Sequence, residues 1–314
     1  MKRSIWRKLF GSLFKLFVPA FLLILAVVIV SAILLVHNAA EPPRAAYLVT
    51  PDKLGEIIRN RMNITEETWQ NKDTTGARGW LLHGQEKAPA VVLLHRYGTD
   101  RSWLLNLGVK LNEATGFTVL IPDQRGHGEN PSVKWTSFGG GEAEDLLSAI
   151  EFLRTKKVVD RIGVYGVEMG AVAALFGAGA DKSIQSLALD SVPGSSEDVL
   201  ESVVKSRSSY AGEFAYQIAC RGTHLYYRNA FRHDSLCDAA KSLDNRRVLL
   251  LGGKDALKLQ ETTLDLKNCL GASNVEAKTD LQVSGYSLVN MASSQQQEEY
   301  NRLVIDFFRQ TLSF

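Results

Sequence analysis

The stretch that most constrains the fold is a short apolar run that enters a helix of small residues through a turn between two glycines. It occupies residues 163–172 (GVYGVEMGAV). Segments with helical periodicity, such as residues 142–153, separate it from similar runs. Strands that alternate with helices predict an α/β fold with right-handed crossovers and a mainly parallel central sheet, with functional residues at the carboxyl ends of the strands. The other apolar runs are residues 90–94, 117–121, 184–189 and 248–251.

The remaining patterns complete one domain over residues 51–314. Residues 68–82 predict a hairpin with a polar turn at residues 71–76, and Pro51 begins a short helix. Residues 192–245 contain no further strand pattern and predict a helical cap insertion over the sheet. The C-terminal segment places apolar side chains at helical spacing, which predicts a helix facing the core; these side chains are Tyr300, Val304, Phe307 and Phe308.

The N-terminal segment predicts a membrane anchor. Residues 17–36 are interrupted only by Pro19 and Ser31, and about 20 apolar residues suffice for a helix to cross roughly 30 Å of hydrocarbon. Five Lys or Arg and no acid precede this run, which keeps the N-terminus cytoplasmic and places the folded domain across the membrane. A signal peptide cut near residues 37–40 is the alternative, although its apolar core is usually about 7–15 residues long.

The flanks of the anchor and the charge distribution constrain the partners. Residues 1–16 carry apolar side chains at helical spacing opposite basic ones, which predicts either a helix along the cytoplasmic membrane surface or a solvated tail. Residues 37–50, with two adjacent prolines, predict a short stiff linker. Beyond residue 36 acidic residues outnumber basic residues by three and no basic block occurs. We therefore expect a membrane partner through residues 17–36 and no nucleic-acid partner.

Four short motifs each follow a predicted strand. They are LHRYG (94–98), DQRGHG (123–128), GVEMG (166–170) and LGGKD (251–255). With these motifs in this order and spacing, the chain from about Trp69 to the C-terminus resembles the α/β-hydrolase superfamily. Within it, the resemblance is to bacterial serine hydrolases related to the prolyl-oligopeptidase and acylaminoacyl-peptidase lineage. The resemblance implies an α/β-hydrolase fold with a cap.

Two of the three catalytic positions that the resemblance implies are substituted. Working members carry a serine at the centre of a G-x-S-x-G elbow, followed in the chain by an aspartate and a histidine. Here Glu168 stands at the elbow, Asp255 matches the acid, and Tyr286 stands where the histidine is expected. A chain without the hydroxyl and the imidazole lacks the ordinary means of acyl transfer.

The oxyanion hole is predicted to be altered as well. Its donors in this fold are the backbone N–H after the nucleophile, here that of Met169, and one from the loop after the third strand, which contains Arg96 and Tyr97. Relatives usually begin this loop His-Gly, whereas this chain has His95-Arg96. We expect an ion pair between Arg96 and Glu168, because a lone buried carboxylate carries a desolvation penalty of several kcal/mol. The alternative is an Arg96 directed to solvent and a Glu168 that meets only water and backbone amides.

Three other residues are candidates for the missing chemistry. His95 and His127 lie in loops at the top of the predicted sheet and can serve as substitute bases, but bracing the loops by hydrogen bonds is the favoured role. Ser191 directly follows Asp190 and is a candidate for a relocated nucleophile, against the simpler interpretation of a loop serine.

The predicted cap contains two Cys/His pairs at i,i+4 spacing, Cys220 with His224 and His233 with Cys237. The set can form a Cys220–Cys237 disulfide, contain free thiols, or hold zinc. Because an oxidising compartment is expected for the domain, the disulfide is favoured and no metal or other cofactor is expected. Cys269, the third cysteine, is then expected to pack in the core.

The sequence therefore predicts a membrane-anchored α/β-hydrolase-fold protein that has lost its catalytic apparatus. Such a pseudoenzyme is expected to bind a small acyl or peptide ligand, or a protein partner, under the cap. Arg96, Glu168, Asp255 and Tyr286 are expected to line the former active site. The alternative is an active esterase- or peptidase-like hydrolase that uses Glu168 as nucleophile or base, with His95 or His127 assisting.

Overall fold

A computed structural model describes residues 2–44, 46–58, 63–129, 131–156, 159–207, 217, 235–270 and 274–313. The chain divides into two compact units. One comprises Met1–Ala39 with Glu201–Arg228, and the other comprises Ala40–Leu200 with Asn229–Phe314.

The first unit contains the long N-terminal helix α1 (Lys2–Ala40), which has Pro19 in its interior. Its segment Phe17–Ala40 is long and apolar enough to cross a membrane. The predicted span (17–36) and the described part of the predicted basic segment, from Lys2 onward, thus lie on one continuous helix. The apolar part extends four residues beyond the prediction, because His37, Asn38, Ala39 and Ala40 continue the helix.

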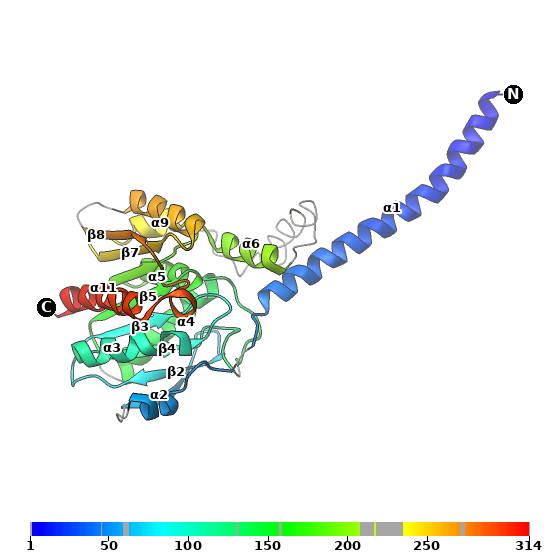
Figure 1. The fold of residues 1–314 in the computed structure, drawn as a ribbon. Helices are drawn as coiled ribbons and strands as arrows, with labels where there is room; N and C mark the ends of the chain where they lie inside the picture. Colours follow the sequence, from blue (N-terminus) through cyan, green and yellow to red (C-terminus); the bar gives the residue numbers. More distant parts are fainter. Residues whose placement is uncertain are drawn as a thin grey trace. The chain divides into compact units, whose positions relative to one another are not determined.

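The second unit is built on an eight-stranded sheet in the order β1-β2-β4-β3-β5-β6-β7-β8 (Figure 1). The hairpin strands β1 and β2 pair antiparallel, β2 also pairs antiparallel with β4, and every other pairing is parallel. This mixed, mostly parallel sheet confirms the predicted α/β-hydrolase fold class. The strands are β1 (Ile64–Gln70), β2 (Gly76–Leu82), β3 (Ala90–Leu94), β4 (Thr118–Pro122), β5 (Ile162–Val167), β6 (Ile184–Asp190), β7 (Arg247–Gly253) and β8 (Val275–Leu281).

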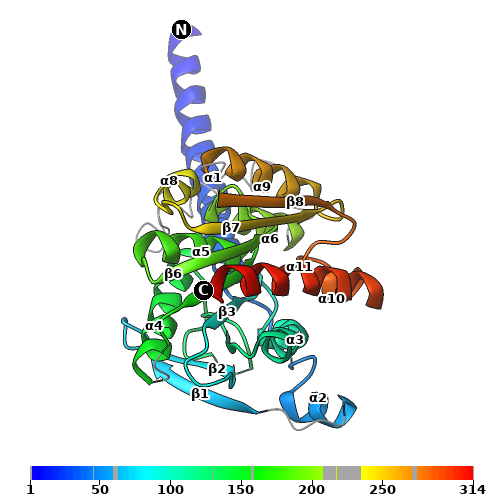
Figure 2. The same ribbon diagram turned by 90° about the vertical axis from the view of Figure 1, so that its left-hand side faces the viewer.

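Helices cover both faces of this sheet (Figure 2). One face packs against α4 (Gly140–Lys156), α5 (Met169–Ala180), α8 (Leu236–Lys241) and α9 (Leu257–Cys269). The other packs against η1 (Arg101–Leu104), α3 (Leu105–Thr115) and α11 (Ser294–Leu312), whose predicted apolar stripe is buried. Because β3, β4 and β5 are buried along their whole length, they appear in the sequence as continuous apolar runs. The short helices are α2 (Pro51–Ile58), α6 (Ser196–Arg207) and α10 (Leu288–Met291).

The segment that the sequence predicts as a linker is residues 37–50, and from Ala40 onward it is part of the second unit and packs within it. The Ala40 carbonyl accepts a hydrogen bond from the Thr136 amide at 2.9 Å. The Tyr47 hydroxyl donates to Asp123 at 2.6 Å, and the Tyr47 ring meets Trp80 edge-on at 5.2 Å between centroids. These contacts could not be predicted from the sequence, because each joins this segment to a residue far away in the chain.

The predicted cap, residues 192–245, is described at its two ends, where α6 and α8 confirm helical structure. Residues 208–216 and 218–234 lie outside the described part of the chain. The predicted Cys220–Cys237 disulfide is wrong, because Cys237 on α8 bonds to Cys269 at the end of α9. Cys269 is therefore a disulfide partner and not the unpaired core thiol that we expected. The two residues are 32 positions apart, and the bond fastens α8 to α9.

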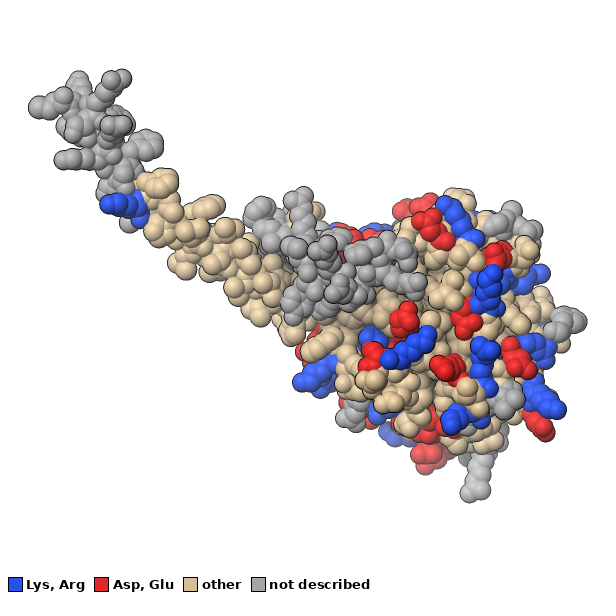
Figure 3. Space-filling model, turned by 180° about the vertical axis from the view of Figure 1, so that it is seen from behind, with Lys and Arg blue, Asp and Glu red and all other residues tan. Residues whose placement is uncertain are grey.

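Charged side chains of both signs are interspersed on the face of the second unit that Figure 3 shows. Ion pairs at the surface of this unit include Lys182 with Asp244 and Lys278 with Glu276. Among the described residues of that face, neither sign gathers into a continuous patch.

Candidate functional site

The strand–turn–helix between β5 and α5 forms the predicted elbow. Glu168, at its apex, has φ 50° and ψ −109°, a backbone conformation that costs energy for a residue with a side chain. The two flanking glycines make the turn possible by their size. A Cβ on Gly166 would lie 2.3 Å from the Gly170 carbonyl oxygen, and one on Gly170 would lie 2.4 Å from that of Leu94. The chain thus keeps the backbone geometry of an elbow without the serine.

The Glu168 carboxylate lies against the two backbone amides that the sequence predicts as oxyanion-hole donors. Its Oε2 accepts a hydrogen bond from the backbone N–H of Tyr97, in the loop after β3, at 2.9 Å. The same oxygen accepts one from the backbone N–H of Met169 at 3.4 Å. These two amides are the donors that the fold provides for a tetrahedral oxyanion. One side-chain oxygen therefore occupies both donors at once.

Burial sets the electrostatics of this carboxylate. Glu168 is only 5% exposed. Burial raises the pKa of the Glu168 carboxyl above its ordinary value, while the Tyr97 amide, the Arg96 charge and the Met169 amide oppose the rise. Two backbone amides and the Arg96 charge thus oppose the effect of burial together, but burial outweighs them.

The expected ion pair between Arg96 and Glu168 is wrong. The Arg96 guanidinium donates to the Tyr97 carbonyl at 3.2 Å. It lies over two aromatic rings, 4.6 Å from the centroid of Tyr286 and 5.3 Å from that of Trp103. Cation–π contacts stabilise a desolvated guanidinium without a carboxylate. Among the described residues Arg96 has no ion-pair partner within 4.0 Å, so it affects Glu168 through its charge and not through contact.

Asp255 and Tyr286 are the predicted equivalents of the triad acid and base. Asp255 follows β7 and lies beside the turn after β8, and Tyr286 lies in that turn. Asp255 Oδ1 accepts from the Ser284 amide and its Oδ2 accepts from the Ser284 hydroxyl, both at 2.8 Å. The carboxylate therefore holds the turn itself. Tyr286, two residues further on, is half-buried. Burial raises the pKa of its phenol, the Glu168 charge adds to the rise, and the Arg96 charge opposes it. A neutral phenol under a cation does not act as the missing base.

A buried hydrogen-bond network centred on Asp190 also holds the turn after β8. Sequence reasoning did not find this network. Asp190, at the end of β6, accepts from the Ser191 hydroxyl at 2.6 Å, the Gly285 amide at 3.0 Å and the Tyr300 hydroxyl at 2.5 Å. The Tyr300 hydroxyl also lies 2.8 Å from that of Tyr165. An acid directly after an apolar strand is a sequence signal for such a site, but its partners lie on distant elements. Asp190 and Asp255 together fix the turn that contains Tyr286.

Both candidate histidines are buried and engaged at both ring nitrogens. His95 Nδ1 donates to the Arg96 carbonyl at 2.9 Å, and its Nε2 accepts from the Gln124 amide at 3.2 Å. His127 Nδ1 donates to the Arg125 carbonyl at 2.9 Å, and its Nε2 accepts from the Gly98 amide at 3.1 Å. Since each Nε2 faces a backbone N–H, both rings are neutral with the proton on Nδ1.

Burial also removes the basicity of these rings. It lowers the pKa of His95 to about 4, against the opposing hydrogen bond to the Arg96 carbonyl. It lowers the pKa of His127 to about 3, and the neighbouring His95 acts in the same direction. Their geometry is that of loop braces, because a general base needs a free lone pair within reach of the proton that it accepts.

Two of the remaining candidates, Ser191 and Cys237, are already bonded to other groups. Ser191 is fully buried, and its hydroxyl donates to Asp190. The Cys237 sulfur is in a disulfide and is not a thiolate ligand. Cys220, His224 and His233 lie outside the described residues. Within the described part of the chain, no group of three or more His, Cys, Asp or Glu side chains is arranged to hold a metal ion.

A cavity of about 180 Å³ lies beside the elbow. Its apolar lining includes Leu104 and Leu107 on the α3 side and Val167 at the end of β5. Arg96 and Asn301 on α11 also line it, and among the described residues no hydrogen-bond partner is present for Arg96 Nε or for the two buried amide atoms of Asn301. The cavity therefore combines an apolar wall with a cationic donor and an unsatisfied amide.

Comparison with known proteins places these features in a family. The sequence model of the family described as serine aminopeptidase, S33, matches residues 84–247, just over half of the chain. The thiohydrolase apmlB of Arthrinium phaeospermum is 31% identical over 128 residues, which cover 40% of this chain and 42% of that protein. The uncharacterised protein YqkD of Bacillus subtilis is 44% identical over 66 residues, 21% of each chain. The matched segments thus span less than half the length of these relatives.

Solved structures share the fold over much more of the chain. The Pyrococcus furiosus esterase Pf2001 matches with a TM-score of 0.64 and 21% identity, over 87% of this chain and 98% of that one. The acylaminoacyl peptidase of Pyrococcus horikoshii matches with a TM-score of 0.56 and 17% identity, over 83% of this chain and 44% of that one. The matched family model shows that the chain belongs to the serine aminopeptidase, S33, family of the α/β-hydrolase superfamily, and the order of strands and the elbow agree with this.

Proposed function

We propose that this protein is a catalytically inactive member of its family that binds a small acyl ligand. One observation carries the proposal: the two backbone amides of the oxyanion hole already donate to Glu168 Oε2. Stabilisation of the developing oxyanion is usually the largest single contribution to acyl transfer on such scaffolds. A permanent occupant of the hole removes it, and the substitutions at the serine and histidine positions remove the nucleophile and the base.

The competing mechanism, in which Glu168 attacks an ester, is disfavoured by the same contacts. Attack on an ester develops an oxyanion that needs hydrogen-bond donors, and the two N–H groups in position to supply them are occupied by Glu168 Oε2. Hydrolysis of the resulting anhydride would then require a base, and His95 and His127 are committed to backbone partners.

The location that we propose is the outer side of a membrane, with α1 as a single-pass anchor and its basic N-terminus in the cytoplasm. The length and apolar character of Phe17–Ala40 support an anchor. The Cys237–Cys269 disulfide supports an oxidising compartment for the α/β unit.

The cavity of about 180 Å³ beside the elbow supports a specific class of ligand, a short-chain carboxylate. Arg96 presents a charge without an ion-pair partner among the described residues, and its Nε lacks an acceptor. The apolar wall formed by Leu104, Leu107 and Val167 suits a short hydrocarbon chain. Proteins similar to this chain are named for acting on acyl groups, as esterase, thiohydrolase or acylaminoacyl peptidase. A free acid is the form of such a group that pairs with a guanidinium.

The test of inactivity is ester turnover by the full chain in detergent, compared with its Glu168→Ala variant. We expect both proteins to hydrolyse p-nitrophenyl butyrate at the rate of buffer alone, and neither to be labelled by a fluorophosphonate probe. Turnover that is present in the wild type and lost in Glu168→Ala would show that Glu168 performs chemistry, and would overturn the proposal.

The test of ligand class is calorimetric titration of the full chain with butyrate and with butyramide, its uncharged isostere. We expect butyrate to bind and Arg96→Gln to weaken this binding about tenfold or more, since a hydrogen bond to a charged group contributes about 1.5–3 kcal/mol. Lys110→Gln is the matched control, because it removes a cation from α3 outside the lining of this cavity. Equal affinity for butyrate and butyramide would contradict the assignment.

A further inference from the structure

The segment between α1 and α2 contributes to the cavity beside the elbow. Leu48 and Val49 line this cavity together with Leu288 and Val289 of α10. Residues 46–49, which we call the strap, belong to no helix or strand. The sequence predicts them as linker, but their place in the lining makes them part of the proposed ligand site.

The strap separates this cavity from solvent. Leu48 is 55% exposed and Val289 is 41% exposed, although both line the cavity. The lining residues next to the elbow, such as Tyr165 and Val167, are buried. A side chain that lines a cavity and is also exposed forms part of its outer wall. Displacement of Leu48 is therefore expected to open the cavity to solvent.

The strap is fastened through the side chain of Tyr47. The Tyr47 hydroxyl donates to Asp123 Oδ2 at 2.6 Å and accepts from the Arg78 guanidinium at 3.3 Å. The Tyr47 ring lies 4.9 Å from the Arg101 guanidinium. Burial and the Asp123 charge raise the pKa of the Tyr47 phenol, so this phenol keeps its proton and remains the donor.

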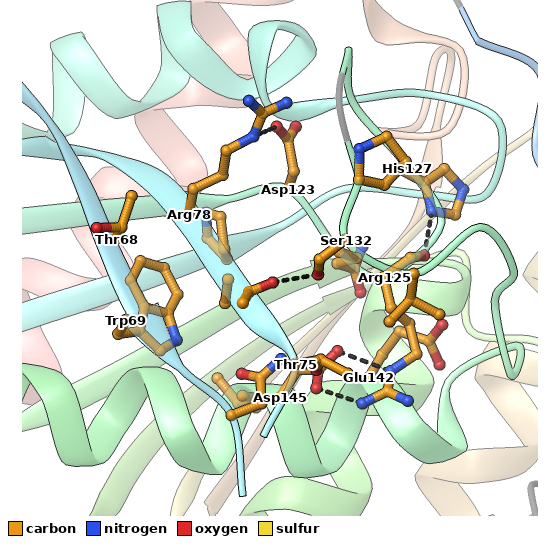
Figure 4. Close-up of a pocket in the computed structure, with 18 of the residues that line it drawn as sticks. Thr68, Trp69, Thr75, Arg78, Asp123, Arg125, His127, Ser132, Glu142 and Asp145 are labelled. Carbon is orange, nitrogen blue, oxygen red and sulfur yellow. Dashed lines mark hydrogen bonds and ion pairs between the residues drawn. The ribbon is translucent and has the colours of Figure 1, made fainter. Parts of the chain in front are cut away.

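The acceptor of this hydrogen bond is itself held in place. The Asp123 side chain is only 4% exposed, and its Oδ2 lies 3.3 Å from Arg101 Nε. Its Oδ1 accepts from the Arg101 backbone amide at 3.2 Å. The same carboxylate pairs with Arg78 in the lining of a second cavity, of about 270 Å³ (Figure 4). Movement at the contact between Tyr47 and Asp123 is therefore expected on the Tyr47 side.

Few other hydrogen bonds hold the strap. The Leu48 amide donates to Ser102 Oγ at 3.0 Å. Among the described residues, the strap has no hydrogen bonds besides this one and those of Tyr47. Segments with few hydrogen bonds and few buried contacts open locally at a low cost in free energy. A hydrogen bond to a carboxylate is stronger than one between neutral groups, so the Tyr47 hydroxyl is the main fastening.

We propose that the strap is a gate of the ligand cavity and that Tyr47 keeps this gate closed. When the Tyr47 hydroxyl releases Asp123, Leu48 and Val49 move away from the lining and a ligand can enter. Tyr47 is not in the lining, so it is a positioning residue that acts through Leu48 and Val49. The inference rests on the proposed function, because it takes this cavity as the ligand site.

The experiment measures how fast a thiol inside the cavity reacts with methyl methanethiosulfonate, a small neutral reagent. Leu107→Cys places the thiol in the lining on α3. Cys220→Ser removes the third native cysteine, because Cys237 and Cys269 are bonded to each other. We expect Tyr47→Phe to speed modification at residue 107 about tenfold, which is the loss of roughly one hydrogen bond to a charged group. Mass spectrometry of the full chain in detergent follows the reaction.

A second thiol position distinguishes opening of the gate from unfolding of the domain. Val109→Cys lies on the same helix, is buried as Leu107 is, and is outside the lining. We expect Tyr47→Phe to leave its modification rate unchanged. Thr99→Cys is a second reporter in the lining, of nearly the same size as the residue that it replaces. The urea midpoint, followed by tryptophan fluorescence, verifies that each variant is folded.

Two results would overturn the gate. One is a rate at residue 107 that Tyr47→Phe does not change, and the other is an equal acceleration at residues 107 and 109. No ligand takes part in this reaction, so its outcome does not depend on the class of ligand that the cavity prefers. A failure of butyrate to bind would contradict the proposed ligand, whereas unchanged thiol rates would contradict the gate alone.

Discussion

The double variant Glu168→Ser/Tyr286→His is expected to hydrolyse p-nitrophenyl butyrate at least about 10²-fold faster than the wild type. The first substitution supplies a hydroxyl at the elbow and empties the two amides that now bind Glu168 Oε2. The second supplies an imidazole in the turn that Asp255 already holds through Ser284. A positioned general base contributes about 10²–10⁴-fold in rate. The measurement is the initial rate of the full chain in detergent over a range of ester concentrations.

The single variants are the controls for this experiment. Because a nucleophile and its base act as a unit, Glu168→Ser alone and Tyr286→His alone are expected to stay near the wild-type rate. The double variant should also be labelled by a fluorophosphonate probe at residue 168. If the double variant is folded and gains nothing, the elbow and the turn are not in register for catalysis, and the interpretation of residues 168 and 286 as a former nucleophile and base fails.

Loss of the disulfide is expected to have the largest effect on stability. Cys237→Ser removes a cross-link between residues 32 positions apart, which lowers the free energy of unfolding by about 3–4 kcal/mol in the chain-entropy model. Urea denaturation of the full chain, followed by tryptophan fluorescence, measures the change. The midpoint is expected to fall to the same value when the wild type is treated with a reductant.

Cys220→Ser is the matched control, since Cys237 already has a partner in Cys269. We expect this variant to unfold at the wild-type midpoint and to keep its sensitivity to reductant. The opposite pattern, with Cys220→Ser destabilised and Cys269→Ser unaffected, would restore the pairing of Cys220 with Cys237.

The fold was largely predictable from the sequence because its signals are local. The apolar runs became β3 to β7, the hairpin became β1 and β2, and the C-terminal stripe became α11. The elbow was predictable for the same reason, since it needs a residue without a Cβ at each of its two flanking positions, Gly166 and Gly170. A continuous pattern of this kind records which residues are buried and how tightly the chain turns.

The contacts of the site were not predictable in the same way. Charge complementarity suggested that Arg96 pairs with Glu168. A sequence does not show which backbone amides are available as partners, and two such amides bind the Glu168 carboxylate. The aromatic contacts of Arg96 depend on Trp103 in η1 and on Tyr286 in the turn after β8, which are far apart in the chain. The pairing of three cysteines was open for a similar reason, because sequence spacing does not report which two of them the fold brings together.

The Glu168 side chain, which binds the two amides of the predicted oxyanion hole, is part of the chain itself. This affects how an acyl compound that enters the site competes for these amides. A soluble inhibitor leaves its enzyme as it is diluted and yields to an excess of substrate. The Glu168 side chain does not leave on dilution, because its local concentration is fixed by covalent connection, and a competitor displaces it only by exceeding that local concentration. Raising the ester concentration therefore frees these amides only above that local concentration, whereas Glu168→Ala removes their occupant outright.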